Sequence, residues 1–560
     1  MKFPKRSALI AAMLGFITLQ AVAQSPPDAG RLMQDQERLQ MPEPLRSVPL
    51  PRLDEAARPP LQAPDSLRVR VTAFRFSRNT VFTEAMLAPL LADLIGKELS
   101  LADLNAAALR ITDYYRKNGF FVASAYVPAQ DIRDGVVEIT VLEGVLDKLQ
   151  LDNHSRVADR ILQAYLSDLQ QGRPLAGDTL ERSLLLIDSL PGVNVQSTLK
   201  PGASIGATDL DIRVDGQARV GGNVSLDDYG NRFVGAWRPG VQLNANSPLG
   251  LGDSLSLHAT TSDGHFDYDR LAYQLPVGGN GLQLGGAWST MNYRLGLNFA
   301  PLEAHGNADI ASIYALYPLQ RTRTGNVNLQ VNIDHKNMDD LADSTKTHTD
   351  KTVQLLTLGV SGDLVDTLAG SGFTSWSLAY AGGQLRLDPT AATLDAAGLR
   401  TNGEYGKWSA MVSRQQSADT LGQALSLWGQ VSSQIAGKNL DSSEKFSLGG
   451  IQGVRAYPQG ESPCDDALLA NIEVRYMLGM PGFEWQLSGF YDAATGRLNH
   501  TPLATDTNNR QNLSGLGLGA NLLQSGGLSV STSLAWRTSR SPISDRDRMP
   551  RLWMNLQQRF

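Results

Sequence analysis

The C-terminal three-fifths of the chain, residues 217–560, is a series of short alternating segments, and this pattern limits the possible folds most. In SLWGQVSSQI, the apolar residues Leu427, Val431 and Ile435 are separated by an even number of positions, and Gln434 lies on the opposite face. Alternation of period two predicts β-strands with one apolar and one polar face. A sheet with an apolar outer face cannot leave open edges in hydrocarbon, so we expect these strands to close into a transmembrane barrel.

Chain length sets the number of strands. At roughly 10 residues per spanning strand, sixteen antiparallel strands use about 160 of about 345 residues, whereas eight would leave very long loops. We therefore expect about 16 strands, with polar outer loops at 335–351 and 386–403. The last strand, RLWMNLQQRF, ends on Phe560, and a terminal aromatic residue is typical of bacterial outer-membrane barrels. An ordinary C-terminal edge strand is the alternative.

The N-terminus has the pattern of a secretory signal peptide. Lys2, Lys5 and Arg6 precede an apolar run that ends near Ala21-Val22-Ala23, so we expect residues 1–23 to be cleaved. The run is shorter than the roughly 20 residues of a membrane-spanning helix. Residues 24–66 are proline-rich and contain one short candidate helix, DAGRLMQDQERLQM, with a partial apolar stripe. A solvated spacer is the alternative for this segment.

Two segments with mixed helix and strand patterns precede the barrel. In residues 67–144 the order is strand, helix, helix, strand, strand, and the same kind of order recurs in residues 145–216. A capping box at Ser100 and Asp103 begins the second helix of the first segment, and Gly119 ends it. We expect two small α+β domains in tandem, followed by the barrel at 217–560.

Composition excludes several other functions. The formal charge is −6 and becomes about −9 without the three basic residues of the leader, so nucleic acid is not an expected partner. Cys464 is the only cysteine, which excludes an intrachain disulfide, and the seven histidines are scattered. The letters GASIG at 202–206 lie between two strands rather than at a nucleophile elbow. We expect no catalytic residue, no metal, no cofactor and no enzymatic activity.

The stretch FSLGGIQGVRAYPQGE carries the most informative motif, Val454-Arg455-Ala456-Tyr457. It resembles the two-partner secretion transporters, the TpsB family of haemolysin and filamentous-adhesin exporters, which are distantly related to Bam-type assembly factors. In that family a VRGY-type motif lies on a long loop folded back into the barrel lumen. Ala456 replaces the usual Gly, so the turn here lacks the freedom that Gly has at positive φ.

A second family motif, F-x-D-x-G, has its counterpart at Phe490, Asp492 and Ala494. Strand parity, independently of the resemblance, places Asp492 on the polar, lumen-facing side of its strand. A lone charge in a confined lumen is costly, so we expect an ion pair between Arg455 and Asp492 that holds the loop inside. Two unrelated solvated charges are the alternative.

The resemblance covers nearly the whole mature chain. It implies a plug helix near residues 28–41, two POTRA domains in the periplasm and a barrel in the outer membrane. An exposed POTRA sheet edge can bind an extended client by adding a strand. The implied partner is a large secreted exoprotein, whether a TpsA-type haemolysin, an adhesin or a contact-dependent toxin. The resemblance also implies outer-membrane lipid around the barrel, and periplasmic chaperones and the barrel assembly machinery as partners during its biogenesis.

The implied function is export of this exoprotein through the lumen. The sequence has no G-x-x-x-x-G-K-[ST] motif for ATP, so folding of the partner outside the cell is the implied energy source. A Bam-type insertase is the first alternative, disfavoured by having two rather than several POTRA domains. A passive porin is the second alternative, disfavoured by the long N-terminal region.

Overall fold

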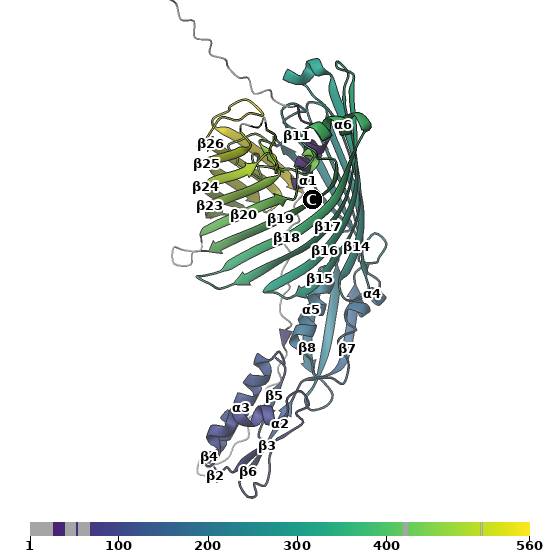
Figure 1. Cartoon of the computed structure of the whole chain (residues 1–560). Helices are drawn as coiled ribbons and strands as arrows, with labels where there is room; N and C mark the ends of the chain where they lie inside the picture. The colour runs from purple at the N-terminus through teal and green to yellow at the C-terminus, as the bar shows by residue number, and fades with distance from the viewer. Residues whose placement is uncertain (1–25, 40–51, 54–67, 418–423, 505, 507) are drawn as a thin grey trace, which may run out of the picture.

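The computed structural model describes residues 26–39, 52–53, 68–417, 424–504, 506 and 508–560. The predicted signal peptide, residues 1–23, lies outside these residues, as does most of the predicted linker. The molecule is elongated, with two small domains in line below one side of a large barrel (Figure 1). No helix within the described ranges has the length and apolarity needed to cross a bilayer.

The barrel is closed, and the described part of the chain supplies sixteen antiparallel strands to it. Each strand pairs with its neighbour in sequence, which confirms the predicted architecture. The strands are β10 (Val220–Asp227), β11 (Arg238–Asn246), β12 (Ser254–Thr261), β13 (Phe266–Val277), β14 (Leu282–Arg294), β15 (Ala304–Arg321), β16 (Gly325–Ala342), β17 (Thr347–Asp366), β18 (Gly372–Leu387), β19 (Gly403–Ser417), β20 (Leu425–Ala436), β23 (Asp466–Met480), β24 (Phe483–Arg497), β25 (Arg510–Gln524), β26 (Leu528–Arg537) and β27 (Arg551–Arg559).

The C-terminal strand closes the barrel against the first barrel strand. β27 pairs with β10 from Asn223↔Arg559 to Asp227↔Asn555. The terminal Phe560 adds two main-chain hydrogen bonds with Gly222, of 3.1 and 3.2 Å. Phe560 is therefore part of the closure and not the end of a free edge.

The alternation read from the sequence separates the two faces of the wall. On β20, Leu427, Val431 and Ile435 are exposed on the outer surface, while Ser426 and Gln434 are buried toward the interior. The outer face is apolar and the inner face is polar, as a barrel in lipid requires.

The prediction of a loop at 335–351 is wrong. β16 and β17 are 18 and 20 residues long and continue as a tall hairpin, with only residues 343–346 in the turn. Lys336 and Lys351 in this stretch face the occupied interior and are buried, which a polarity-based prediction cannot distinguish from exposure. The second predicted loop, 386–403, contains a short helix, α6 (Pro389–Ala397).

Two α+β domains precede the barrel, as expected. The first contains β2 (Arg68–Arg70), β3 (Ala73–Ser77), α2 (Glu84–Leu87), the 3-10 helix η1 (Ala88–Leu94), β4 (Glu98–Ser100), α3 (Leu101–Lys117), β5 (Ser124–Tyr126) and β6 (Val136–Leu142). The second contains β7 (Val145–His154), α4 (Asp159–Tyr165), α5 (Gly177–Asp188), β8 (Val193–Pro201) and β9 (Ala207–Gly216), and β1 (Arg52–Leu53) pairs with β8 at its edge. The predicted capping box of Ser100 and Asp103 is present at the start of α3.

The expected first strand of the first domain is split. Val71 N donates to Lys97 O, and Thr72 N donates to Gly135 O, so the two sides of the break pair with different partners. β2 joins β4 in a two-stranded sheet, while β3 joins β6 and β5 in a three-stranded sheet.

The second domain is fastened to the inner end of the barrel, the end nearest the small domains. On α5, Glu181 Oε1 accepts from Arg323 N at 2.7 Å, and Arg182 Nη2 donates to Pro318 O at 2.9 Å. Ala158 N donates to Gly250 O at 2.9 Å on another turn of the barrel. These contacts lie on the turns of β11–β16, so the domain covers one side of the barrel end.

Candidate functional site in the barrel lumen

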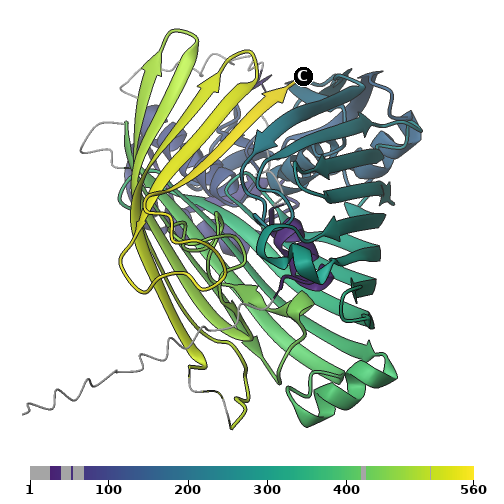
Figure 2. The same cartoon turned by 90° about the horizontal axis from the view of Figure 1, so that it is seen from above.

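The helix α1 (Ala29–Leu39) lies inside the barrel, surrounded by strands (Figures 1 and 2). Its apolar residues Ala29, Leu32 and Met33 are at most 4% exposed. They pack in one cluster with side chains of the barrel wall, among them Tyr268 and Met291. The alternative of a solvated spacer is therefore wrong for this segment. The partial apolar stripe is the face that contacts the wall.

Polar contacts also join α1 to the barrel wall. Ala29 N donates to Asp340 Oδ1 at 2.8 Å. Lys351 Nζ donates to Asp28 Oδ2 at 3.2 Å, and Arg238 Nη1 donates to Gln36 Oε1 at 2.7 Å. All of these contacts come from side chains or from the helix end, because α1 takes no part in the sheet.

Residues 437–465, between β20 and β23, form a loop that folds back inside the barrel, and we call it the lumen loop. It contains η4 (Ser442–Glu444), β21 (Phe446–Ser447) and β22 (Pro463–Cys464). α1 packs directly on η4, since a methyl group on Gly30 would lie 2.7 Å from Ser443 Cβ. The helix and the lumen loop thus occupy the interior together.

Glu444 anchors the start of the lumen loop to the wall. Its carboxylate lies 3.0 Å from Lys336 Nζ and 2.8 Å from Lys407 Nζ. Burial alone would raise the pKa of Glu444, but the two ammonium groups outweigh it and lower that pKa to about 2. Glu444 is therefore ionised and paired at neutral pH.

The structure brings Arg455 and Asp492 together as predicted. Arg455 Nε and Nη2 donate to the two carboxylate oxygens of Asp492 at 2.9 and 2.7 Å, and Arg455 N donates to Oδ2 at 3.1 Å. Asp492 is fully buried on β24. Bidentate pairs of this kind are strong and fix orientation as well as distance. The alternative of two separate solvated charges is wrong.

Several further partners of Arg455 and Asp492 were not found from the sequence. Arg455 Nη1 donates to Glu473 Oε1 at 2.6 Å, Asn471 Nδ2 donates to Asp492 Oδ1 at 2.8 Å, and Trp553 Nε1 donates to Arg455 O at 2.7 Å. Asn471 lies directly across from Asp492 in the pairing of β23 with β24. That register, together with strand parity, is the signal that could have identified Asn471 and Glu473 as lumen-facing.

The other motif residues surround this pair. Val454 and Tyr457 are fully buried, and Tyr457 Oη donates to Arg540 O at 2.6 Å. The Phe490 ring centroid lies 3.5 Å from the Arg455 guanidinium carbon. Ala494 is buried in the same apolar cluster as Val454 and Tyr457.

Ala456 fits where the family usually has Gly. It is not among the residues with positive φ; in this loop those are Gly450, Gly460 and Ser462. The Ala456 methyl group is accommodated because Gly515 on β25 has no side chain, and a methyl group there would lie 2.5 Å from Ala456 Cβ. The predicted loss of backbone freedom therefore has no consequence.

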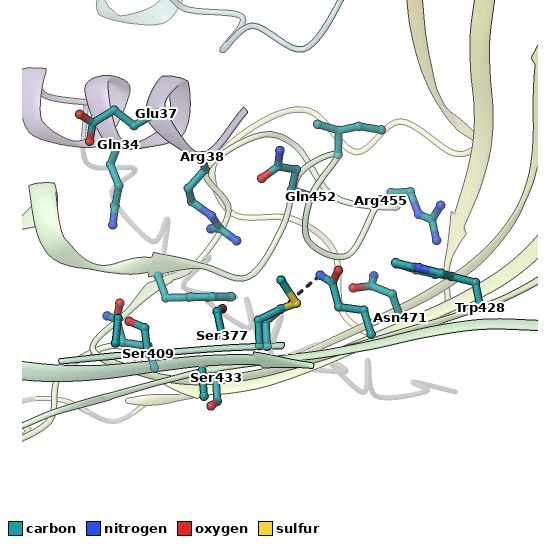
Figure 3. Close-up of a pocket in the computed structure, with 18 of the residues that line it drawn as sticks. Gln34, Glu37, Arg38, Ser377, Ser409, Trp428, Ser433, Gln452, Arg455 and Asn471 are labelled. Carbon is teal, nitrogen blue, oxygen red and sulfur yellow. Dashed lines mark hydrogen bonds between the residues drawn. The ribbon is translucent and has the colours of Figure 1, made fainter. Parts of the chain in front are cut away.

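A cavity of about 570 Å³ remains beside α1 and the lumen loop (Figure 3). Gln34, Glu37 and Arg38 border it from α1, and small or polar wall residues such as Ser409 and Ser433 border it from β19 and β20. The interior is thus filled only in part.

Comparison with known proteins identifies the family to which the chain belongs. A model of the haemolysin secretion/activation proteins ShlB/FhaC/HecB matches residues 206–522, which is more than half of the chain. The chain belongs to this family. A second model, of the ShlB-type POTRA domain, matches residues 69–144. This ShlB-type transporter is therefore an outer-membrane protein whose POTRA domains lie in the periplasm.

Individual relatives match nearly the whole length of the chain. The heme/hemopexin transporter protein HuxB of Haemophilus influenzae strain 86-028NP is 29% identical over 549 residues, which cover 95% of each chain. The structure of CdiB from Escherichia coli matches with a TM-score of 0.73 at 19% identity, over 92% of this chain and 94% of that one. CdiB from Acinetobacter baumannii matches with a TM-score of 0.66 at 18% identity, over 95% and 97%. At these identities the two structures show a shared fold.

Proposed function

We propose that this ShlB-type transporter exports one large secreted protein through its barrel lumen, without ATP and without covalent chemistry, after the POTRA domains bind that protein in the periplasm. The proposal rests on the helix α1, which occupies the lumen and can be removed from it. α1 is held by side-chain and helix-end contacts and not by strand pairing, so it can leave without breaking the sheet.

The exoprotein class follows from the relatives. One relative is named as a heme/hemopexin transporter, and others are named as the CdiB outer membrane transporter and the hemolysin transporter protein HpmB. These names support a large exoprotein as the partner. Folding of that partner outside the cell would prevent its return and supply the direction of transport. Periplasmic chaperones and the barrel assembly machinery would insert the barrel itself.

Two alternatives are less well supported. The ShlB-type match of both the barrel and the first POTRA domain favours secretion over a Bam-type insertase. The helix and the loop in the lumen favour secretion over a passive porin, because they obstruct free solute passage.

Co-expression with a large secreted repeat protein encoded by a neighbouring gene tests the proposal. We expect that protein in the medium when the full transporter is present, and in the periplasm when residues 68–144 are deleted. Retention in the periplasm despite a correctly inserted full-length barrel would contradict the proposed function.

A further inference from the structure

Two adjacent residues of the lumen loop, Gly460 and Glu461, lie between α1 and the loop at 538–550, which we call the outer loop. The outer loop joins β26 to β27 at the outer end of the barrel. We propose that Glu461 is a positioning residue that couples the departure of α1 to the opening of the outer loop over the extracellular exit. This rests on the proposed function in one respect, namely that the exoprotein leaves through the lumen.

Glu461 fastens the outer loop. Its carboxylate accepts from Ile543 N at 3.0 Å, from Ser544 N at 2.8 Å and from Arg540 Nη2 at 3.1 Å, and also from the Ser544 hydroxyl. The side chain is 1% exposed. Four donor groups from one loop converge on one buried carboxylate, so the loop conformation depends on it.

Gly460, one residue earlier, contacts the helix. Arg31 of α1 donates a hydrogen bond to Gly460 O. Gly460 has a φ of +75°, and a methyl group on it would lie 2.9 Å from both Arg31 Nε and Asp35 Oδ2. The helix surface therefore rests directly on this peptide, and glycine is required both for the conformation and for the close approach.

The covalent link between the two contacts leaves little freedom for independent movement. The Gly460 carbonyl that accepts from Arg31 and the Glu461 N–H belong to one planar peptide, and the Glu461 carbonyl is the pivot about which Glu461 can turn, since it accepts from Leu448 N and Gly449 N, both at 3.1 Å. When α1 leaves, the Gly460 peptide loses its partner and relaxes, which displaces the Glu461 carboxylate from its donors. Hydrogen bonds weaken steeply with such displacement, so the outer loop is released.

The single cysteine is a native reporter of this opening. Cys464 is fully buried, and Arg540 of the outer loop donates to the neighbouring Ser462 Oγ at 2.7 Å. Burial raises the pKa of the Cys464 thiol to about 12, so the reactive thiolate is scarce while the lumen loop stays packed against the wall. Labelling of intact cells with a membrane-impermeant maleimide therefore measures how often this region opens.

The test compares Glu461→Gln, Arg31→Ala and the double variant. Each single change should raise the labelling rate about tenfold or more, because loss of a hydrogen bond to a charged group shifts an opening equilibrium by at least that order. If the two contacts are coupled, the double variant labels no faster than the faster single variant. Glu404→Gln, at an exposed site near the outer end, and Gln34→Ala, on the cavity side of α1, are matched controls that should label like the parent.

Two results would overturn the coupling. The first is an unchanged labelling rate in Glu461→Gln, and the second is a double-variant rate equal to the product of the two single effects. Heat-modifiable migration of the barrel in gel electrophoresis verifies that each variant is folded. Ser544→Ala provides a milder second variant, because it removes only one hydroxyl donor to the Glu461 carboxylate. No exoprotein enters this assay, so its outcome is separate from that of the secretion experiment.

Discussion

At the scale of single residues, the lumen loop depends on one guanidinium group. Arg455 binds Asp492 with two hydrogen bonds, binds Glu473 with a third and stacks on Phe490. The family resemblance, which implies that the Arg455 loop enters the lumen, predicted the first of these contacts together with strand parity and the need to pair a charge there. The remaining contacts depend on exact cross-strand register, which a sequence pattern does not define. Gly515 is a clear example, because its role is only to leave room for Ala456.

Arg455→Ala should abolish export while the barrel still inserts. The change leaves the buried Asp492 carboxylate without its main partner, at a cost of about 3 to 5 kcal/mol if the site stays dry, so the loop leaves its position. Arg455→Lys should also fail, because an ammonium group cannot reproduce the bidentate geometry. Secreted exoprotein in the medium and heat-modifiable barrel in the outer membrane are the two measurements. Arg497→Ala, at an exposed position, is the control, and full secretion by Arg455→Ala would refute the role.

At the scale of elements, α1 is a helix in which three polar residues are buried almost as completely as the apolar ones. Arg31, Asp35 and Gln36 are each at most 7% exposed. Their burial arises from the surrounding barrel, so no local pattern in the sequence marks them as interior. Leu32 and Met33, in contrast, could be read as a partial apolar stripe.

Leu32→Asp should release α1 and open the lumen. The new carboxylate would be buried among apolar side chains without a partner, which costs several kcal/mol and favours the undocked helix. We expect larger single-channel conductance in planar bilayers and greater sensitivity of cells to large antibiotics. Gln34→Asp adds the same charge on the cavity side of the helix and should change conductance little. Equal conductance of the two variants would contradict the docking of α1 by this face.

At the scale of the whole molecule, the barrel and the tandem α+β domains were predictable because periodicity and chain length define them. The placement of the second α+β domain against the barrel was not, because it depends on single contacts between distant turns. Gly279 shows this dependence: a methyl group there would lie 2.0 Å from Ala164 O of α4. The close approach of the two parts requires the absence of a side chain at this position.

Gly279→Val should separate the second α+β domain from the barrel. The added side chain clashes with the main chain of α4, and overpacking of this kind costs about 1 to 3 kcal/mol. We expect faster limited proteolysis near residues 216–219 and a several-fold drop in secretion. Gly526→Val changes another inner-end turn, where the space is open, and should behave like the parent. Unchanged proteolysis of Gly279→Val would show that the domain is held elsewhere.

The second α+β domain is attached to one side of the barrel, and the unfilled part of the lumen lies on the other. The turns of β11–β16 carry the periplasmic domain, whereas the unfilled space of the lumen borders β18–β20 and β23. Under the proposed function, a polypeptide delivered along the POTRA domains would meet a route that is off the barrel axis from the start. Its first contacts inside would be with the serine-rich half of the wall, beside the helix rather than beneath it.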